Sequence, residues 1–262
     1  MSWGCRGPID FRFGNRLHNV CRWNCRSHCG KYKIANKYTS FWRREVQPAL
    51  KSSKLFERGD AMAREIFAFL SIGSTYTYLT ALRLRSVLSA ADAKMVFRPF
   101  SVRNIMLDMD NVPFPPSKPE KQVYMWRDIE RRAEKYDLPA LKMPVAYPLR
   151  QFDMANWAGV VANNEGWYLD YLEATYRLWF VEGIAAGSEE NLTQICVVLG
   201  RDYDALVELA TAPETAHEYY ENTNEARALG VFGAPSFVVG NELFWGDDRL
   251  EDAVAHYAAS EG

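Results

Sequence analysis

The pattern of apolar and polar residues between positions 65 and 100 predicts a strand, a helix and a second strand. The apolar run IFAFL at 66–70 has the length and aromatic content of a buried strand. A turn of small residues follows at 71–74, and helical spacing then relates Tyr78, Leu79, Leu82, Leu84 and Leu88. With a second strand at 94–100, this segment has the length and order of a βαβ unit, so we expect parallel strands.

The C-terminal segment is predicted to form a hairpin and a helix. Two short apolar runs, 236–239 and 242–245, are separated by Gly240-Asn241, which is typical of an antiparallel hairpin. Gly246-Asp247-Asp248 then opens a helix at 249–258. Pro235 stands at the start of the first of these strands, where a residue without an N–H is unusual. A cis Ala234–Pro235 bond would expose a backbone edge there.

The region between these two ends carries only helical patterns. We expect a loop at 101–119, because prolines stand at 113, 115, 116 and 119. Helices are predicted at 121–136, 153–164, 166–181, 191–199, 202–211 and 213–229. Asn191 and Asp202 are suited to cap two of them, and Gly230 ends the last.

The order of elements predicts an α/β protein with a thioredoxin-like fold and an inserted all-helical domain. Residues 62–100 and 230–262 are expected to form the thioredoxin-like domain. Residues 101–229 are expected to form the helical insertion and its connecting helix.

Residues 1–61 form a basic extension that differs from the rest. Of 31 basic and 33 acidic residues in the chain, thirteen and four lie in residues 1–60, so the remainder carries about −11. The spacing Cys21-x3-Cys25-x2-His28-Cys29 leaves a zinc site as one alternative, and the Arg-rich composition leaves a targeting segment as another. We favour a disordered tail, or sequence upstream of the natural start with Met62 opening the domain, and assign no metal site.

Composition narrows the function classes. No run of about 18 apolar residues is present to span a membrane. A net charge of −2 gives no electrostatic reason to expect nucleic acid as a partner. Cys196 is the one cysteine outside the extension, which excludes a disulfide framework there. We therefore expect a soluble, cytoplasmic protein.

Six segments of the chain resemble one enzyme family. They are FLSIGSTYTYL, FRPFSVRNIM, MDN, YMWRDIERRA, GVFGAPSFVVG and ELFWGDDRLEDA, spread over about residues 63–257. Together they resemble the 2-hydroxychromene-2-carboxylate isomerase family, in the kappa-class glutathione transferase group of DsbA-like thioredoxin folds. The resemblance implies glutathione as cofactor, a small aromatic substrate and a homodimer. It also implies a cis–trans isomerisation in aromatic catabolism, through reversible addition of the glutathione thiolate.

The residues at the start of the first predicted helix agree with this resemblance. A disulfide oxidoreductase of this fold needs Cys-x-x-Cys there, because one thiolate attacks and a second thiol resolves. The chain has Ser74-Thr75-Tyr76-Thr77 instead, so any reacting thiol must come from a ligand. Ser74 is the predicted catalytic residue. Its hydroxyl would donate to the glutathione sulfur and, with the positive helix N-terminus, favour the thiolate.

The resemblance also assigns binding residues. Ala234, before Pro235, would offer its backbone to the cysteinyl part of glutathione, as in strand addition. Trp245-Gly246-Asp247-Asp248 matches a family Trp-Gly-Asn-Asp segment whose N–H groups and carboxylate would hold the γ-glutamyl end; Asp247 departs from the common Asn. Asn111 and Lys121 are further glutathione candidates. The substrate candidates are Arg103, Asn111, Lys118 and Tyr147.

Two other functions remain open. A kappa-like glutathione transferase would conjugate electrophiles and leave glutathione in the product. A non-catalytic thioredoxin-like module would bind protein partners, and the aromatic helices within 121–181 would then serve as an interface.

Overall fold

The computed structural model describes residues 65–112, 114–115 and 117–260. The predictions for the basic extension, including the cysteine and histidine spacing and the role of Met62, lie outside these residues. Within the described ranges, no helix is long and apolar enough to cross a membrane.

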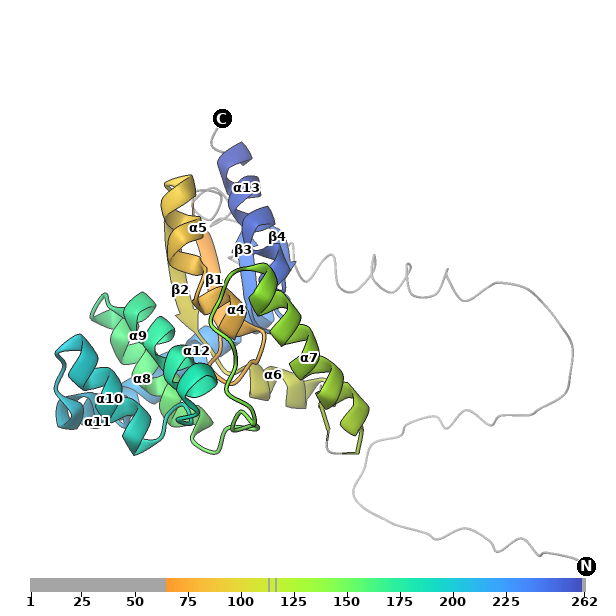
Figure 1. Ribbon diagram of the computed structural model, residues 1–262. Helices are drawn as coiled ribbons and strands as arrows, with labels where there is room; N and C mark the ends of the chain where they lie inside the picture. The colour runs from red at the N-terminus through yellow and green to blue at the C-terminus, as the bar shows by residue number, and fades with distance from the viewer. Residues whose placement is uncertain (1–64, 113, 116, 261–262) are drawn as a thin grey trace, which may run out of the picture. The chain divides into compact units, whose positions relative to one another are not determined.

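Four strands form one mixed sheet in the order β2-β1-β3-β4 (Figure 1). β1 (Ile66–Leu70) pairs in parallel with β2 (Met95–Pro99). β3 (Ser236–Val239) pairs antiparallel with both β1 and β4 (Glu242–Trp245). All residues of β1 and β3 are buried, as expected for the two central strands. The predicted parallel pair and C-terminal hairpin are therefore confirmed.

Helices cover the sheet and link its strands. α4 (Thr77–Ala81) and α5 (Leu84–Ala91) follow β1, and α13 (Leu250–Ser260) follows the 3₁₀ turn η3 (Asp247–Arg249). α13 contacts α5, β1 and β3. Both α8 (Phe152–Asn164) and α12 (Pro213–Ala228) contact β2 instead, so segments from the middle of the chain also pack on the sheet.

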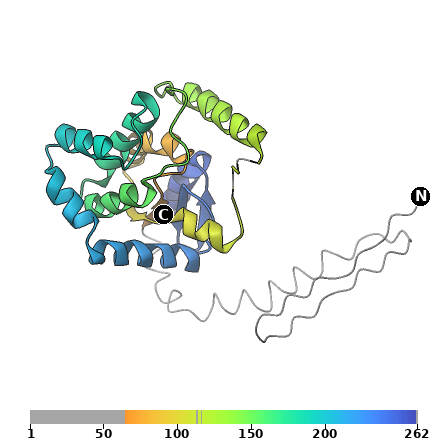
Figure 2. The same ribbon diagram turned by 90° about the horizontal axis from the view of Figure 1, so that it is seen from below.

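The remaining helices lie between β2 and α12 in the sequence. They are α6 (Val102–Asp108), α7 (Pro119–Lys135), α9 (Tyr168–Tyr176), the π-helical segment η2 (Arg177–Glu182), α10 (Glu189–Leu199) and α11 (Tyr203–Ala210). Figures 1 and 2 both show α7 apart from the group formed by α8 to α11. The buried apolar side chains of the sheet and of these helices nevertheless form one cluster, which includes Phe69, Phe100, Tyr171, Trp179 and Phe237.

The single helix predicted around 78–88 is wrong, because the structure has two helices there. α4 ends at Ala81 and α5 begins at Leu84. Between them, the Arg83 N–H bonds to the Thr80 carbonyl three residues back, at 3.0 Å. The Nε of the Arg83 side chain donates to the Leu79 carbonyl instead, at 3.1 Å. This carbonyl therefore accepts from a side chain where a regular helix would supply a backbone N–H, and the helix is interrupted without any Gly or Pro.

Two further local predictions are wrong for reasons of capping. The loop expected at 101–119 contains α6, because the Ser101 hydroxyl accepts the Asn104 N–H at 3.3 Å and caps it. The N-cap of α10 is Ser188, which accepts the Asn191 N–H at 3.1 Å, so Asn191 lies inside the helix. Asp202 caps α11 as predicted.

Candidate functional site

Ser74 lies in the turn between β1 and α4 and is half-buried. Its hydroxyl donates a hydrogen bond to the carbonyl oxygen of Ala234 at 2.6 Å, across 160 positions of sequence. The Ala234–Pro235 peptide bond is cis, as predicted. The structure therefore brings together the two segments that the family resemblance assigned to one ligand.

Asn156 of α8 holds the turn that carries Ser74. It is 1% exposed, and its amide binds both backbone groups of Ile72: the Ile72 N–H donates to Oδ1 at 2.9 Å, and Nδ2 donates to the Ile72 carbonyl at 2.8 Å. Tyr176 of α9 donates its hydroxyl to the Ser74 carbonyl at 2.8 Å. Side chains of two distant helices thus replace the ladder partners that the chain loses when β1 ends.

Gly73 lets the turn pass close to α8. Its φ is +124°, in the region that favours glycine, and a Cβ at this position would come within 2.5 Å of the Phe152 ring. The Phe152 ring is also covered on one side by the guanidinium of Arg103, 3.9 Å from the ring centroid. A larger residue at 73 would therefore displace either Phe152 or the turn that presents Ser74.

The expected place of Ser74 at a helix start is wrong by two residues. The N-cap of α4 is Tyr76, and the helix has five residues. The Ser74 N–H donates to the Ser71 carbonyl at 3.2 Å. Thr75 and Tyr76 turn toward α7, where their hydroxyls donate to the sulfur of Met125 and to a carboxylate oxygen of Asp128, each at 3.1 Å. If Ser74 stabilises an anion as predicted, its hydroxyl would contribute more than the N-terminus of α4, which begins two residues later.

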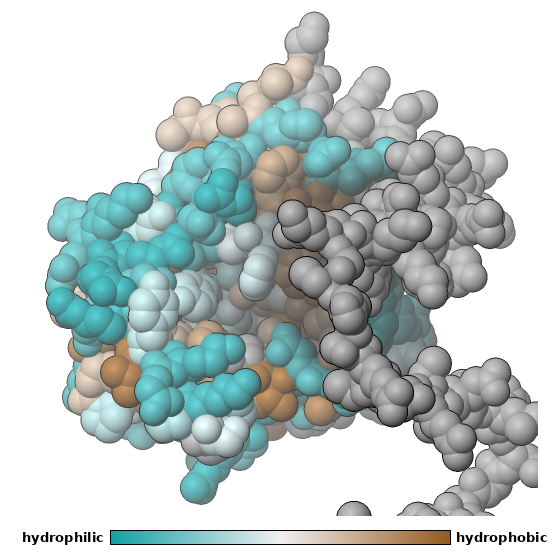
Figure 3. All heavy atoms as spheres, turned by 90° about the vertical axis from the view of Figure 1, so that its right-hand side faces the viewer, coloured by the Kyte–Doolittle hydropathy of each residue, from teal (hydrophilic) through white to brown (hydrophobic). Residues whose placement is uncertain are grey.

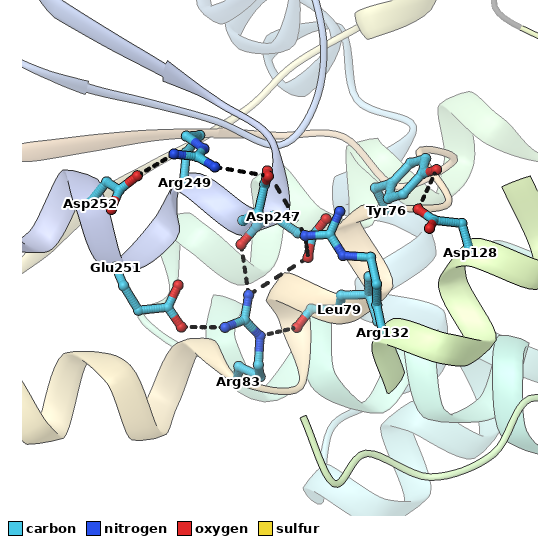
Figure 4. Close-up of polar contacts among 10 residues, drawn as sticks. Tyr76, Leu79, Arg83, Asp128, Arg132, Asp247, Arg249, Glu251 and Asp252 are labelled. Atoms are coloured by element: carbon cyan, nitrogen blue, oxygen red, sulfur yellow. Dashed lines mark hydrogen bonds and ion pairs between the residues drawn. The ribbon is translucent and has the colours of Figure 1, made fainter. Parts of the chain in front are cut away.

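Asp247 lies in the interior, not at the surface. It is 1% exposed, and its Oδ2 lies 2.7 Å from Arg132 of α7 and 3.8 Å from Arg83 (Figure 4). Burial raises the pKa of this carboxyl to about 6, against the opposing effect of the two arginines. Its side chain therefore faces the two arginines, and the prediction that residue 247 binds glutathione stays a prediction.

Asp248 differs from its neighbour. Its side chain is 44% exposed and pairs with Arg249 at 3.0 Å. Burial tends to raise the pKa of Asp248, but the hydrogen bond from Arg249 and the positive charges of Arg132 and Arg249 together outweigh it, so the pKa lies below its usual range. Of the two carboxylates, Asp248 is the one that can meet a ligand.

Arg83 and Arg132 are the residues that sequence reasoning missed. Arg83 is 7% exposed, donates to the Asp247 carbonyl at 2.6 Å and pairs with Glu251 (Figure 4). Together the two arginines link α7 and the α4–α5 junction to the segment that follows β4. An arginine within the apolar helical stretch LTALRLRS was the available signal, since such a residue is rarely buried without partners.

The predicted substrate residues divide into two groups. Arg103 donates to the Leu149 carbonyl at 2.7 Å, and burial lowers its pKa. Burial raises the pKa of Tyr147, although the positive charge of Arg103 acts to lower it. The Tyr147 ring packs against Trp126, with 5.8 Å between the ring centroids. Arg103 lies over the Phe152 ring, and Gly73 in the turn of Ser74 lies against the same ring. In contrast, Asn111, Lys118 and Lys121 are exposed, and neither lysine forms an ion pair with another described residue.

Fold and site together define a thioredoxin-like protein whose first turn has no redox thiol. The mixed sheet, the turn after β1 and the cis-proline segment are the parts of that fold, and Ser74-Thr75-Tyr76-Thr77 occupies the place of a cysteine pair. The chain matches the DSBA-like thioredoxin domain over residues 65–258 and belongs to that family.

Curated relatives and a solved structure extend this comparison. The 2-hydroxychromene-2-carboxylate isomerase of Sphingobium xenophagum is 29% identical over 194 residues, which are 72% of this chain and 96% of the relative. The enzyme of the same name from Pseudomonas putida is 26% identical over 187 residues, 70% of this chain and 88% of the relative. A solved 2-hydroxychromene-2-carboxylate isomerase structure superimposes with a TM-score of 0.66 at 23% identity, covering 75% of this chain and 97% of that one.

Proposed function

We propose that this protein is a glutathione-dependent isomerase that acts on a substrate of the 2-hydroxychromene-2-carboxylate type. The observation that carries the proposal is the 2.6 Å contact between the Ser74 hydroxyl and the Ala234 carbonyl, in a turn that lacks thiols. The named relatives support the isomerase class, since they match this chain over most of their length. The same relatives support an enzyme over a non-catalytic binding module.

The residues around Ser74 fit a bound peptide thiol. Ala234 precedes a cis-proline and has a carbonyl whose described partner is a movable hydroxyl. Gly246 and the exposed Asp248 follow the adjacent strand β4, and Gly246 N–H donates to the Pro235 carbonyl at 3.0 Å. A peptide lying beside Ala234 would therefore extend toward Asp248. In this assignment Asp247 acts by holding that segment in place.

Each residue has a distinct role in the proposed reaction. Glutathione supplies the nucleophilic thiol that the turn of this chain does not contain. The Ser74 hydroxyl, on leaving the Ala234 carbonyl, donates to the sulfur and favours the thiolate. Ala234 then accepts a backbone N–H of the peptide, and the Asp248 carboxylate meets its ammonium group. We place the carboxylate end of the substrate at Arg103, whose guanidinium lies over the Phe152 ring, and at Tyr147, whose hydroxyl is close enough to Arg103 to be affected by its charge.

The first test is glutathione binding to the full chain by calorimetry, with thiolate absorbance followed against pH. We expect a bound thiol whose pKa is depressed, and in Ser74→Ala a rise of about one unit, since one unit corresponds to about 1.4 kcal/mol. Isomerase activity should fall by about 10² to 10³, as when one anion-stabilising donor is removed. Ser86→Ala is the matched control, because the Ser86 hydroxyl also donates to a carbonyl, that of Arg83, at 2.7 Å.

The outcomes separate the competing functions. Full activity of Ser74→Ala, or activity without glutathione, contradicts the proposal. A product that retains glutathione identifies a kappa-like transferase, and absence of glutathione binding at millimolar concentration favours a protein-binding module. We also propose that the protein is cytoplasmic and forms a homodimer. If it is a homodimer, sedimentation should give twice the chain mass of 30.0 kDa.

A further inference from the structure

Two aromatic side chains are exposed beside the proposed glutathione site, and the proposed reaction leaves one of them without a role. Phe232 is 40% exposed and Trp245 is 52% exposed. Their ring centroids lie 4.7 Å apart with the planes at 61°, an edge-to-face contact that leaves ring surface open to solvent. Figure 3 shows one face of the molecule as mostly hydrophilic, with separate apolar patches. An exposed aromatic pair next to a binding segment is thus a candidate contact for a ligand.

The aromatic pair lies within reach of Ser74. Phe232 precedes Ala234 by two residues, so the two Cα atoms are at most about 7.6 Å apart. The Ala234 carbonyl is itself 2.6 Å from the Ser74 hydroxyl. On the neighbouring strand, Trp245 lies opposite Ser236 in the β3–β4 register. A flat group attached to an atom held at Ser74 can therefore reach the ring of Phe232.

Gly233 fixes the orientation of the pair. A Cβ at position 233 would overlap the indole nitrogen of Trp245, so the indole lies directly against the Gly233 backbone. The Gly246 N–H, next in sequence to Trp245, is tied to the Pro235 carbonyl at 3.0 Å. The indole thus has a fixed support, and Phe232 packs against it. Such preorganisation reduces the ordering cost of binding a planar group.

We infer that Phe232 and Trp245 form a platform for the aromatic ring of the substrate, next to the sulfur that Ser74 would activate. This inference rests on the proposed function and names Phe232 as a specificity residue of the same site. The class of substrate it selects is a planar aromatic ring with a reactive side chain, as opposed to an aliphatic electrophile. Stacking against a fixed aromatic face contributes most for such rings.

The test compares two glutathione thioethers, S-methylglutathione and S-benzylglutathione, by calorimetry with the full chain. We expect the wild type to bind the benzyl form about three- to tenfold more tightly, the gain typical of one aromatic contact. In Phe232→Ala this ratio should fall to about one without loss of affinity for the methyl form. Phe232→Tyr should retain it, and so should the control Tyr220→Ala, which removes an exposed tyrosine of α12.

Each outcome decides the inference. Three results overturn the platform while leaving glutathione binding established: the wild type binds the benzyl and methyl forms equally, Phe232→Ala keeps the wild-type preference for the benzyl form, or Phe232→Ala loses affinity for both forms equally. If the wild type binds neither thioether, the proposed function fails and the platform fails with it. The platform is supported if Phe232→Ala loses the preference for the benzyl form while Phe232→Tyr and Tyr220→Ala keep it.

Discussion

At the scale of the single residue, Asp247 shows how burial and pairing oppose each other. Loss of hydration raises its pKa to about 6, although Arg132 and Arg83 act in the opposite direction. Its ordinary value is 3.8, so the folded protein binds more protons than the unfolded chain between about pH 4 and pH 6. The stabilising contribution of this group is therefore complete below about pH 4 and is lost as the pH rises through about 6.

We expect Asp247→Asn to remove this part of the pH dependence. The free energy of unfolding of the wild type, relative to the variant, should fall by about 3 kcal/mol between about pH 4 and pH 7, because about two pKa units separate the folded and unfolded states. Urea unfolding across this range measures the difference. Asp252→Asn, which removes an exposed partner of Arg249, should keep the wild-type profile. If the free energy of unfolding changes with pH in the same way in the wild type and in Asp247→Asn, the raised pKa of Asp247 is contradicted.

At the scale of the element, α8 positions the functional turn. Its first turns supply Phe152, against which Gly73 packs, and Asn156, which binds the backbone of Ile72. α8 also contacts β2, α9, α11 and α12, so it lies between the sheet and the helical group. The geometry of Ser74 is therefore set by a helix about 80 residues away in sequence.

Asn156→Ala tests this role. The variant leaves a buried N–H and a buried carbonyl of Ile72 without partners, so we expect a loss of about 2–4 kcal/mol in the free energy of unfolding. Glutathione binding, measured where the variant is still folded, should weaken by about tenfold or more as the turn loses its support. Asn164→Ala is the matched control on the same helix, because Asn164 is exposed and bonds to Glu218 at 2.7 Å. Equal effects of the two substitutions would show that α8 does not hold the turn.

At the scale of the whole described fold, the sheet and the helices share one apolar core. Phe237 of β3, Phe152 of α8 and Trp179 of the π-helical segment all belong to it. The residues expected to form a separate helical domain thus bury their apolar faces against the same cluster as the strands. A shared core couples the stability of the parts.

We therefore expect one cooperative unfolding transition for the described part of the chain. Far-ultraviolet circular dichroism reports the helices. The fluorescence of a variant that retains Trp245 and replaces the other seven tryptophans by Phe, at positions 3, 23, 42, 126, 157, 167 and 179, reports the edge of the sheet. The two urea curves should have the same midpoint. Because Trp179 is fully buried, the same variant with Trp179 restored is the control for damage by the substitution. Separate midpoints would indicate that the helical segment unfolds independently.

Local pattern was enough to determine the strands and the chemistry of the turn. The strands at 66–70 and 236–239 were predicted within a residue, because a strand with two buried faces shows as a continuous apolar run. The edge strand at 242–245, which is exposed at both ends, was predicted from its apolar residues and from the Gly240-Asn241 turn before it. The cis bond before Pro235 followed from a proline where a ladder donor was expected. The absence of a thiol at 74–77 is likewise a property of the sequence alone. These features depend on neighbours a few residues away.

Tertiary structure alone decided which of these features meet. The bond from Ser74 to Ala234 spans 160 positions, and that from Ile72 to Asn156 spans 84. No periodicity reports such distances, because it records only which face of an element is apolar. In the sequence, Asp247 stands only in the segment that opens the last helix, whereas in the fold Arg83 and Arg132 from two other elements enclose it. Its burial, and hence its raised pKa, is a consequence of packing between segments that the sequence keeps far apart.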